Sequence, residues 1–245
     1  MKKVFESLIF FLFMLFSSQA WATFLLVRTQ PVFVPYANRQ QIVFSGDSIT
    51  AGNGSTSTGG YRHDLLTYLT DYYDNVTPNV IGGDYANSFS YPIIGLSGIT
   101  SATLKTTYVE PQLAAIPSVT MPTAPDVVFL LIGTNDFLTS VSKATWLSNL
   151  TSIISSFRTA NANCHIFVGN LIDRSTYTST VTDWNSSLAT TLAGISGYNT
   201  FIHPVDLYTA MGPYGATYYG DVTHPNTAGY SLLASAWWTA YQSVF

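Results

Sequence analysis

The sequence is poor in charge. Only 9% of its 245 residues are Asp, Glu, Lys or Arg, and 9 basic against 13 acidic residues leave a formal net charge of −4. A nucleic-acid-binding domain needs clustered Lys and Arg, and a disordered chain needs more charge than this. With 47% apolar residues and enough length for a sizeable core, the chain is expected to fold, with no nucleic-acid partner.

The sequence is also poor in cysteine. Cys164 is the only one, so an intramolecular disulfide is excluded. It precedes the apolar residues 166–168. We therefore expect Cys164 to pack as a small apolar side chain and not to act as a nucleophile.

Long hydrophobic runs are lacking as well. The apolar run over residues 8–16 is shorter than the ~20 residues that a membrane-spanning helix needs. It follows Lys2 and Lys3 and ends before Ala20-Trp21-Ala22, which has the small-x-small form of a signal-peptidase site. We expect a signal peptide over residues 1–22 and a single domain over residues 23–245, secreted or periplasmic and without a stable membrane span. An uncleaved membrane anchor is the alternative.

Strand-like and helix-like segments alternate along the rest of the chain. The pattern predicts strands at 41–45, 79–81, 126–132, 166–171 and 200–205. It predicts helices at 61–73, at 101–116 with a break at Pro111, at 146–159, at 181–195, and at 227–244 with Asn226 as N-cap. Residues 23–40 are expected to lie over the domain edge, and residues 82–99 to form a loop. The alternation indicates an α/β fold: a three-layer α/β/α sandwich of flavodoxin-like type with a mainly parallel, roughly five-stranded sheet.

Polar segments follow three of the predicted strands and precede the last helix. In such sheets, sites lie beyond the carboxyl ends of the strands. Each segment alone is an ordinary turn or helix cap. Their joint occurrence at one sheet edge predicts a site. The segments are Gly46-Asp47-Ser48, Gly95-Leu96-Ser97-Gly98, Gly133-Thr134-Asn135-Asp136 and Asp221-Val222-Thr223-His224.

In this order, the four segments resemble the SGNH hydrolases, also called the GDSL esterase/lipase superfamily. The resemblance runs from about residue 41 to the end of the chain. It implies Ser48 as nucleophile, His224 as base and Asp221 as the residue that orients the base. The implied oxyanion hole consists of Ser48, Gly98 and Asn135. Gly98 is preferred, although Gly95 lies only three residues away.

These residue types suit one reaction. A serine hydroxyl needs a base to take its proton, and imidazole titrates near neutrality. The Asp221 carboxylate can fix the tautomer of His224 and stabilise its protonated form. Backbone and amide N–H groups can stabilise the oxyanion of the tetrahedral intermediate. The expected chemistry is therefore carboxylic ester hydrolysis through an acyl-enzyme, with no cofactor and no metal.

Other polar residues have simpler interpretations. His203 and Asp206 could form a metal site with Asp221 and His224, but a core role for His203 is favoured. His63 and His165 are expected to be structural or exposed. Asp47 and Asp136 are expected to shape their turns by accepting backbone hydrogen bonds. For Arg62, substrate contact and bracing of the helix start remain open alternatives.

Two further features of the sequence bear on the substrate. Gly59-Gly60-Tyr61-Arg62 is similar to a segment of the superfamily's carbohydrate acetylesterases, but the His-Glu-Gly loop that often accompanies it is replaced by residues 88–92. Aromatic side chains are expected near the site, where they could stack on sugars or line an acyl pocket: Tyr85, Phe89, Tyr91, Tyr177, Tyr214, Tyr218 and Tyr219. We expect a monomer that hydrolyses short-chain esters, such as O-acetyl groups on carbohydrate. The alternatives are a lysophospholipase or lipase-type acylhydrolase acting on lipid esters, a transacylase, and a non-catalytic glycan-binding module.

Overall fold

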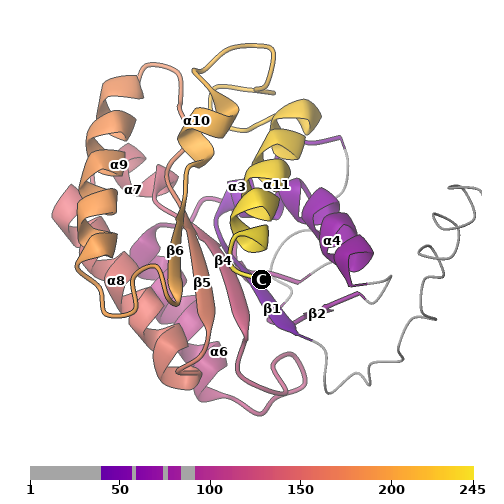
Figure 1. Cartoon of the computed structure of the whole chain (residues 1–245). Helices are drawn as coiled ribbons and strands as arrows, with labels where there is room; N and C mark the ends of the chain where they lie inside the picture. Colours follow the sequence, from indigo (N-terminus) through magenta and orange to yellow (C-terminus); the bar gives the residue numbers. More distant parts are fainter. Residues whose placement is uncertain (1–39, 57–58, 74–76, 84–91) are drawn as a thin grey trace, which may run out of the picture.

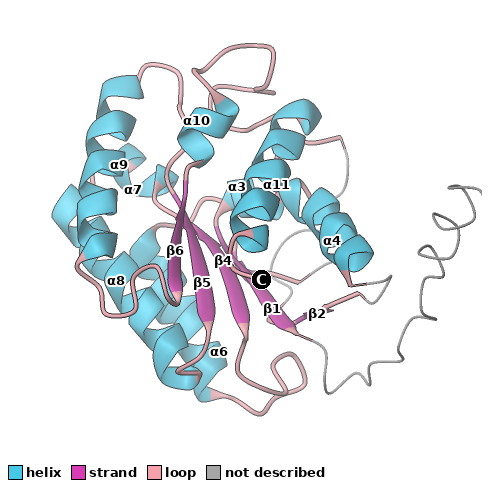
Figure 2. Cartoon of the chain, viewed as in Figure 1, coloured by secondary structure: helices cyan, strands magenta, loops and turns pink. Residues whose placement is uncertain are grey.

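The computed structural model of the protein describes residues 40–56, 59–73, 77–83 and 92–245 (Figure 1). The expected signal peptide and residues 23–39 lie outside these ranges. Within them, helices cover both faces of a central sheet (Figure 2). This arrangement confirms the predicted three-layer α/β/α fold.

The sheet is parallel throughout its described pairs. Its strands are β1 (Gln41–Gly46), β2 (Asn79–Val80), β3 (Ile94–Gly95), β4 (Val127–Leu131), β5 (His165–Gly169) and β6 (Ile202–Val205). Their order is β2-β1-β4-β5-β6, and β3 pairs with the carboxyl end of β1. The prediction of roughly five strands omitted β3, which lies inside the segment expected to be a loop. Two residues are too few to produce an alternating pattern.

The helices follow the predicted positions, with several short additions. They are α3 (Ser48–Ala51), α4 (Tyr61–Tyr72), α5 (Ser101–Thr103), the π-helix η2 (Leu104–Val109), α6 (Glu110–Ala114), α7 (Thr134–Leu138), α8 (Lys143–Ala160), α9 (Thr178–Ala193), α10 (Leu207–Met211) and α11 (Thr227–Gln242). The predicted break at Pro111 is wrong. Pro111 lies in the first turn of α6, where a missing N–H is tolerated, and the wide turns of η2 lead the chain directly into it.

Alternate side chains of the strands build two separate cores. On one face, Phe44 belongs to a cluster that includes residues of α4 and α11. On the other, Val43 belongs to a cluster that includes residues of α8 and α9. Figure 1 shows α4 and α11 on one side of the sheet and α8 and α9 on the other. The rings of Phe44, Phe129 and Phe167 stack across β1, β4 and β5 with centroid separations of 5.5 and 5.3 Å. Burying each such ring contributes roughly 1.5–3 kcal/mol, so the centre of the sheet is a rigid base for the loops at its edge.

Two smaller expectations are also settled. Cys164 is buried against the second core, as predicted, and burial raises the pKa of its thiol to about 12. The Asn226 side chain accepts the Gly229 N–H at 3.0 Å, which confirms it as the N-cap of α11. Among the described helices, none is both long and apolar enough to span a membrane.

Candidate active site

Ser48 stands where β1 gives way to α3. The strand is buried along its whole length and ends at Gly46. Asp47 then caps the short helix, since its Oδ1 accepts the Ile49 N–H at 3.0 Å. The hydroxyl of Ser48 is thereby fixed at the carboxyl edge of the sheet by a strand on one side and a capped helical turn on the other.

His224 comes to Ser48 from 176 residues further along the chain. Its Nε2 lies 2.9 Å from Ser48 Oγ, and its Nδ1 lies 2.8 Å from Oδ2 of Asp221. The turn that carries them is held by backbone hydrogen bonds, including the Gly220 N–H to the His224 carbonyl at 2.9 Å. The structure therefore brings Ser48, His224 and Asp221 into the hydrogen-bonded line that the sequence predicted.

The Asp221 carboxylate is kept ionised by its neighbours. Partial burial alone would raise its pKa, but hydrogen bonds from the His224 ring and from the backbone N–H groups of His224 and Thr223 hold the pKa below its ordinary value. Both backbone bonds go to Oδ1 at 2.7 Å, which leaves Oδ2 for the imidazole. An ionised carboxylate in this place can orient a neutral imidazole and stabilise a protonated one.

Asn135 lies beside the loop of the nucleophile and is bonded to the loop of Gly98. Asn135 lies in α7, directly after β4, and its Nδ2 donates to the Ile99 carbonyl at 3.0 Å. The same nitrogen lies 3.4 Å from Oδ2 of Asp47, next to Ser48. The loop that carries Gly98 is thus joined to the loop that carries Asn135, beside the nucleophile.

The two candidate glycines differ in what surrounds them. Gly95 is part of β3, with φ at +152°, and a Cβ there would lie 1.9 Å from the Gly46 carbonyl oxygen. Gly98 is in the turn that follows, with φ at +81°, and a Cβ there would meet nothing within 4 Å. Gly95 is therefore needed for strand packing, whereas Gly98 has open space beside its backbone. This difference supports Gly98 as the oxyanion glycine.

Asp47 and Asp136 both accept backbone hydrogen bonds, as predicted. Asp136 accepts the Ser101 N–H at 2.8 Å, and Asp47 caps α3 as described above. Burial raises the pKa of Asp47 to about 7, against the opposing hydrogen bond from Ile49 and with a further contribution from nearby Asp136. Burial likewise raises the pKa of Asp136, although the hydrogen bonds from Ser101 oppose the shift.

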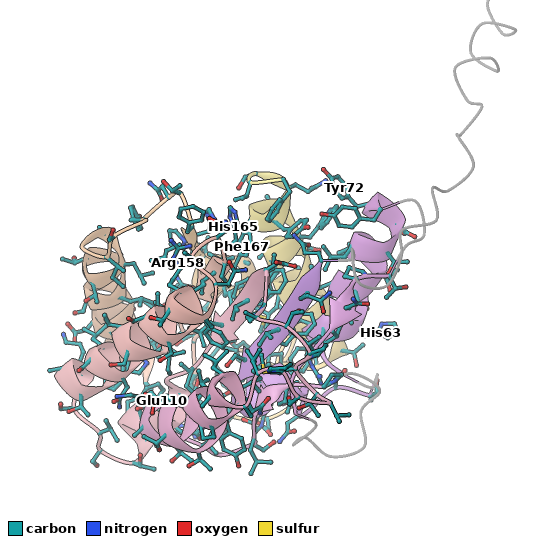
Figure 3. The ribbon with its side chains drawn as sticks, turned by 90° about the horizontal axis from the view of Figure 1, so that it is seen from below. His63, Tyr72, Glu110, Arg158, His165 and Phe167 are labelled. Atoms are coloured by element: carbon teal, nitrogen blue, oxygen red, sulfur yellow. The ribbon has the colours of Figure 1, made fainter. Side chains whose placement is uncertain are left out.

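The residues of the imagined metal site do not meet. His203 Nε2 lies 3.0 Å from Nδ1 of His165, and Asp206 accepts a hydrogen bond from Asn170 at 2.8 Å. In the described part of the chain, no three His, Cys, Asp or Glu side chains are placed to hold a metal ion. The histidine pair lies near Arg158 and Phe167, well apart from His63 (Figure 3).

The structure also decides between the two roles left open for Arg62. Its side chain is fully buried and donates through Nη2 to the Ala51 carbonyl at 3.2 Å. It braces the end of α3 against the start of α4.

Of the aromatic residues predicted to lie near the site, Tyr85, Phe89 and Tyr91 lie outside the described residues.

One nearby residue was missed by the sequence reasoning. Arg174 follows β5 by five residues, and its Nε donates to Oγ1 of Thr223 at 2.7 Å, next to His224. Arg174 lies in the loop that follows the predicted strand 166–171, at the edge of the sheet where sites of such folds lie. No motif marked Arg174 within that loop.

The family model for the GDSL-like lipase/acylhydrolase family matches residues 44–232. This match covers most of the chain, so the chain belongs to that family, within the SGNH hydrolases. It is a carboxylic ester hydrolase. A search of the curated proteins found no match.

Several solved structures share the fold. A carbohydrate esterase family 3 protein from Clostridium thermocellum has a TM-score of 0.66 at 22% identity, covering 84% of this chain and 99% of the other. A carbohydrate esterase family 3 protein from Talaromyces cellulolyticus has a TM-score of 0.67 at 18% identity, covering 83% and 97%. An acetyl esterase mutant, crystallised with an acetate ion, has a TM-score of 0.68 at 17% identity, covering 83% and 97%.

Proposed function

We propose that the protein is a secreted esterase that removes short acyl groups, above all O-acetyl groups on carbohydrate, through an acyl-enzyme on Ser48. The observation that carries the proposal is the line from Ser48 Oγ to His224 Nε2 at 2.9 Å and from His224 Nδ1 to Asp221 at 2.8 Å. This is the geometry of a serine activated by an oriented base.

In the proposed first half-reaction, His224 Nε2 takes the hydroxyl proton while Ser48 Oγ attacks the ester carbonyl carbon. The carbonyl oxygen becomes an oxyanion near Asn135 and Gly98. The alcohol then leaves with the proton from His224. In the second half-reaction, water attacks the acyl-enzyme while His224 takes a proton from it. The bond between the acyl group and Ser48 then breaks, the free acid leaves, and His224 returns the proton to Ser48 Oγ. Removing one oxyanion donor is expected to cost about 2.7–4 kcal/mol of transition-state stabilisation.

The proposed substrate class is supported by the neighbours and the surface near the site. The similar structures are described as an acetyl esterase and as carbohydrate esterases. Tyr214 and Tyr218 are partly exposed in the segment that leads to His224, and aromatic rings there can stack on a sugar. Secretion is proposed from residues 1–22, which have the three parts of a signal peptide.

The decisive experiment replaces the nucleophile. We expect Ser48→Ala to lower kcat on p-nitrophenyl acetate by at least about a thousandfold with an unchanged melting temperature. Ser231→Ala is the control. It also removes a serine hydroxyl, but one that lies between α11 and α4, where it donates to the Asp64 carboxylate at 2.6 Å. Undiminished turnover by Ser48→Ala would refute the assignment of the nucleophile.

A second experiment defines the substrate. The wild-type protein is assayed on p-nitrophenyl esters of rising acyl length, on acetylated xylan and on a lysophospholipid. The proposal predicts that acetyl esters are preferred and that acetate is released from xylan. Faster turnover of the lysophospholipid would replace the proposal with a lipid acylhydrolase, and acyl transfer to an added alcohol in preference to water would indicate a transacylase.

A further inference from the structure

The loop after β5 is held in place by hydrogen bonds to Asp173. Asp173 is buried, and its Oδ1 accepts the Arg174 N–H at 2.8 Å. Its Oδ2 accepts the Tyr214 N–H at 2.9 Å and the Thr178 hydroxyl at 3.2 Å, while its carbonyl accepts the Tyr219 hydroxyl at 2.9 Å. These bonds tie the loop to the segment that leads to His224. Arg174 therefore projects from a fixed backbone.

A chain of contacts then runs from the base to the oxyanion side. The Arg174 Nε donates to Thr223, which directly precedes His224. The guanidinium carbon lies 5.0 Å from the centroid of the Tyr177 ring. That ring lies 5.4 Å from the ring of Phe137, two residues beyond Asn135 in α7. Arg174, Tyr177 and Phe137 thus form a wall of contacts that joins the His224 loop to the Asn135 loop.

The charge in this wall is carried by Arg174. Arg174 is half-buried, and among the described residues no carboxylate forms an ion pair with it. Its hydrogen bond to Thr223 uses Nε, and within the same residues neither Nη1 nor Nη2 has a hydrogen-bond partner. Both terminal nitrogens can therefore donate to a ligand. A guanidinium presents such donors in a planar fork suited to paired oxygen acceptors.

The position of Arg174 relative to His224 indicates which half of the substrate it meets. In acyl transfer the base returns its proton to the leaving alcohol, so the alcohol oxygen lies at His224 Nε2. The carbonyl oxygen faces Asn135 and Gly98. Arg174 is hydrogen-bonded to the residue that precedes His224, so it is attached to the turn that carries the base.

Resting on the proposed esterase function, we propose that Arg174 is a specificity residue that binds oxygen atoms on the alcohol half of the ester through Nη1 and Nη2. The substrates favoured by this contact are acetylated sugars. Their oxygen acceptors are either the neutral hydroxyls of a pentose or the hydroxyls and carboxylate of a uronic acid.

The test compares esters with the same acyl group and different alcohols. Ethyl acetate has no alcohol-side oxygen apart from the ester oxygen. A monoacetylated methyl xyloside adds neutral hydroxyls, and a monoacetylated methyl glucuronoside adds a carboxylate. Acetate release gives kcat/KM for each, and the readout is the ratio of each sugar ester to ethyl acetate. We expect Arg174→Met to lower at least one ratio by about tenfold or more, as expected for a lost hydrogen bond from a charged donor.

Thr223→Val is the matched control. It removes the hydrogen bond that Arg174 makes to the His224 turn but keeps the guanidinium. The proposal predicts that this variant leaves the ratios within about twofold of wild type. A fall confined to the xyloside identifies neutral hydroxyls as the acceptors, and a fall confined to the glucuronoside identifies the carboxylate.

Two results would overturn the proposal. Equal losses on all three esters in Arg174→Met would mean that the residue only braces the turn of His224, and unchanged ratios would mean that it does not contact the alcohol. Either result leaves the proposed esterase function standing as long as wild type hydrolyses ethyl acetate and Ser48→Ala does not. A wild-type protein that hydrolyses none of the esters would refute the esterase function itself.

Discussion

Asp136 binds Ser101 through both oxygens of its carboxylate. Oδ2 accepts the backbone N–H of Ser101 at 2.8 Å, and Oδ1 accepts its hydroxyl at 2.6 Å. The preceding residue, Asn135, donates to the Ile99 carbonyl at 3.0 Å. Two consecutive residues after β4 therefore hold the loop of Gly98 at two points. Gly98 and Asn135 are the two proposed oxyanion residues other than Ser48, so this clamp sets the distance between them.

Loosening the clamp should affect the transition state more than substrate binding. Ser101→Ala removes the hydroxyl that Asp136 accepts and also leaves the Asn149 amide, which donates to Ser101 Oγ at 3.1 Å, without that acceptor. We expect kcat on p-nitrophenyl acetate to fall about tenfold with KM within about threefold of wild type, because oxyanion contacts strengthen as charge develops. Steady-state kinetics measure both constants.

Ser231→Ala serves as the control for the clamp. It also removes a serine hydroxyl that donates to a carboxylate at 2.6 Å, but between α11 and α4. Both variants should lose comparable thermal stability, and only Ser101→Ala should lose kcat. Equal kcat values in the two variants would show that the clamp does not position the oxyanion residues.

The two glycines of the β3 loop should respond differently to alanine. Gly95→Ala places a methyl group against the Gly46 backbone in the β1–β3 pair, so we expect a poorly folded or insoluble protein. Gly98→Ala meets no neighbour and costs only about 1–2 kcal/mol for its left-handed backbone. That variant should fold and lose kcat, because its methyl group occupies space beside a proposed oxyanion donor. Melting temperature and kcat together separate the two; a fully active Gly98→Ala would refute the role of Gly98.

Much of this arrangement was predictable from the sequence because the strands carry strong local signals. The apolar runs that became β1, β4 and β5 are continuous, and each stops at a glycine or at polar residues. Parallel strands then place their carboxyl ends at one edge by topology alone. That is sufficient to bring Ser48 and Asn135 together before any side-chain contact is known.

The features that escaped prediction depend on contacts distant in the sequence. Strand β3 is two residues long and exists only through its pairing with β1. The bond between Arg174 and Thr223 joins residues 49 positions apart, and no local pattern marks Arg174. The helix through Pro111 continues because η2 widens its turns, which residue propensities do not reveal.

Asp47 should make the protein less stable as the pH rises. Its folded pKa is raised to about 7, chiefly by burial, from an ordinary value of 3.8. Between these values the folded protein keeps a proton that the unfolded chain has released, so the free energy of unfolding falls from about pH 4 to about pH 7. Asp47→Asn cannot titrate. As the pH is raised from 4 to 8, we expect the free energy of unfolding of this variant to rise relative to that of wild type by on the order of 2–4 kcal/mol.

Urea unfolding at both pH values checks the prediction. Asp71→Asn removes an exposed carboxylate on α4 and is the control for a change of net charge. The difference between Asp47→Asn and Asp71→Asn should widen with rising pH. A constant difference would show that Asp47 is already ionised in the folded protein at pH 4.

His203 should have the opposite effect on the pH profile. Its ring is buried on β6 and stacks in parallel with that of His165, at a centroid separation of 5.2 Å, and it also packs on Phe167. Burial, and then the neighbouring His165, lowers the pKa of His203 to about 4 from 6.5. The unfolded chain therefore binds a proton between these values that the folded protein does not, and stability is lost as the pH falls below about 6.5.

Replacing this histidine should therefore flatten the acid side of the profile. His203→Gln carries no titrating ring. As the pH is lowered from 7.5 to 5, its free energy of unfolding should therefore rise relative to that of wild type by on the order of 1–2 kcal/mol. His63→Gln is the control, because His63 has a side-chain exposure of 48% and lies on α4, far from the pair. Urea midpoints at the two pH values give the comparison. Parallel profiles for His203→Gln and wild type would mean that the buried pair takes up its proton as readily as the unfolded chain does.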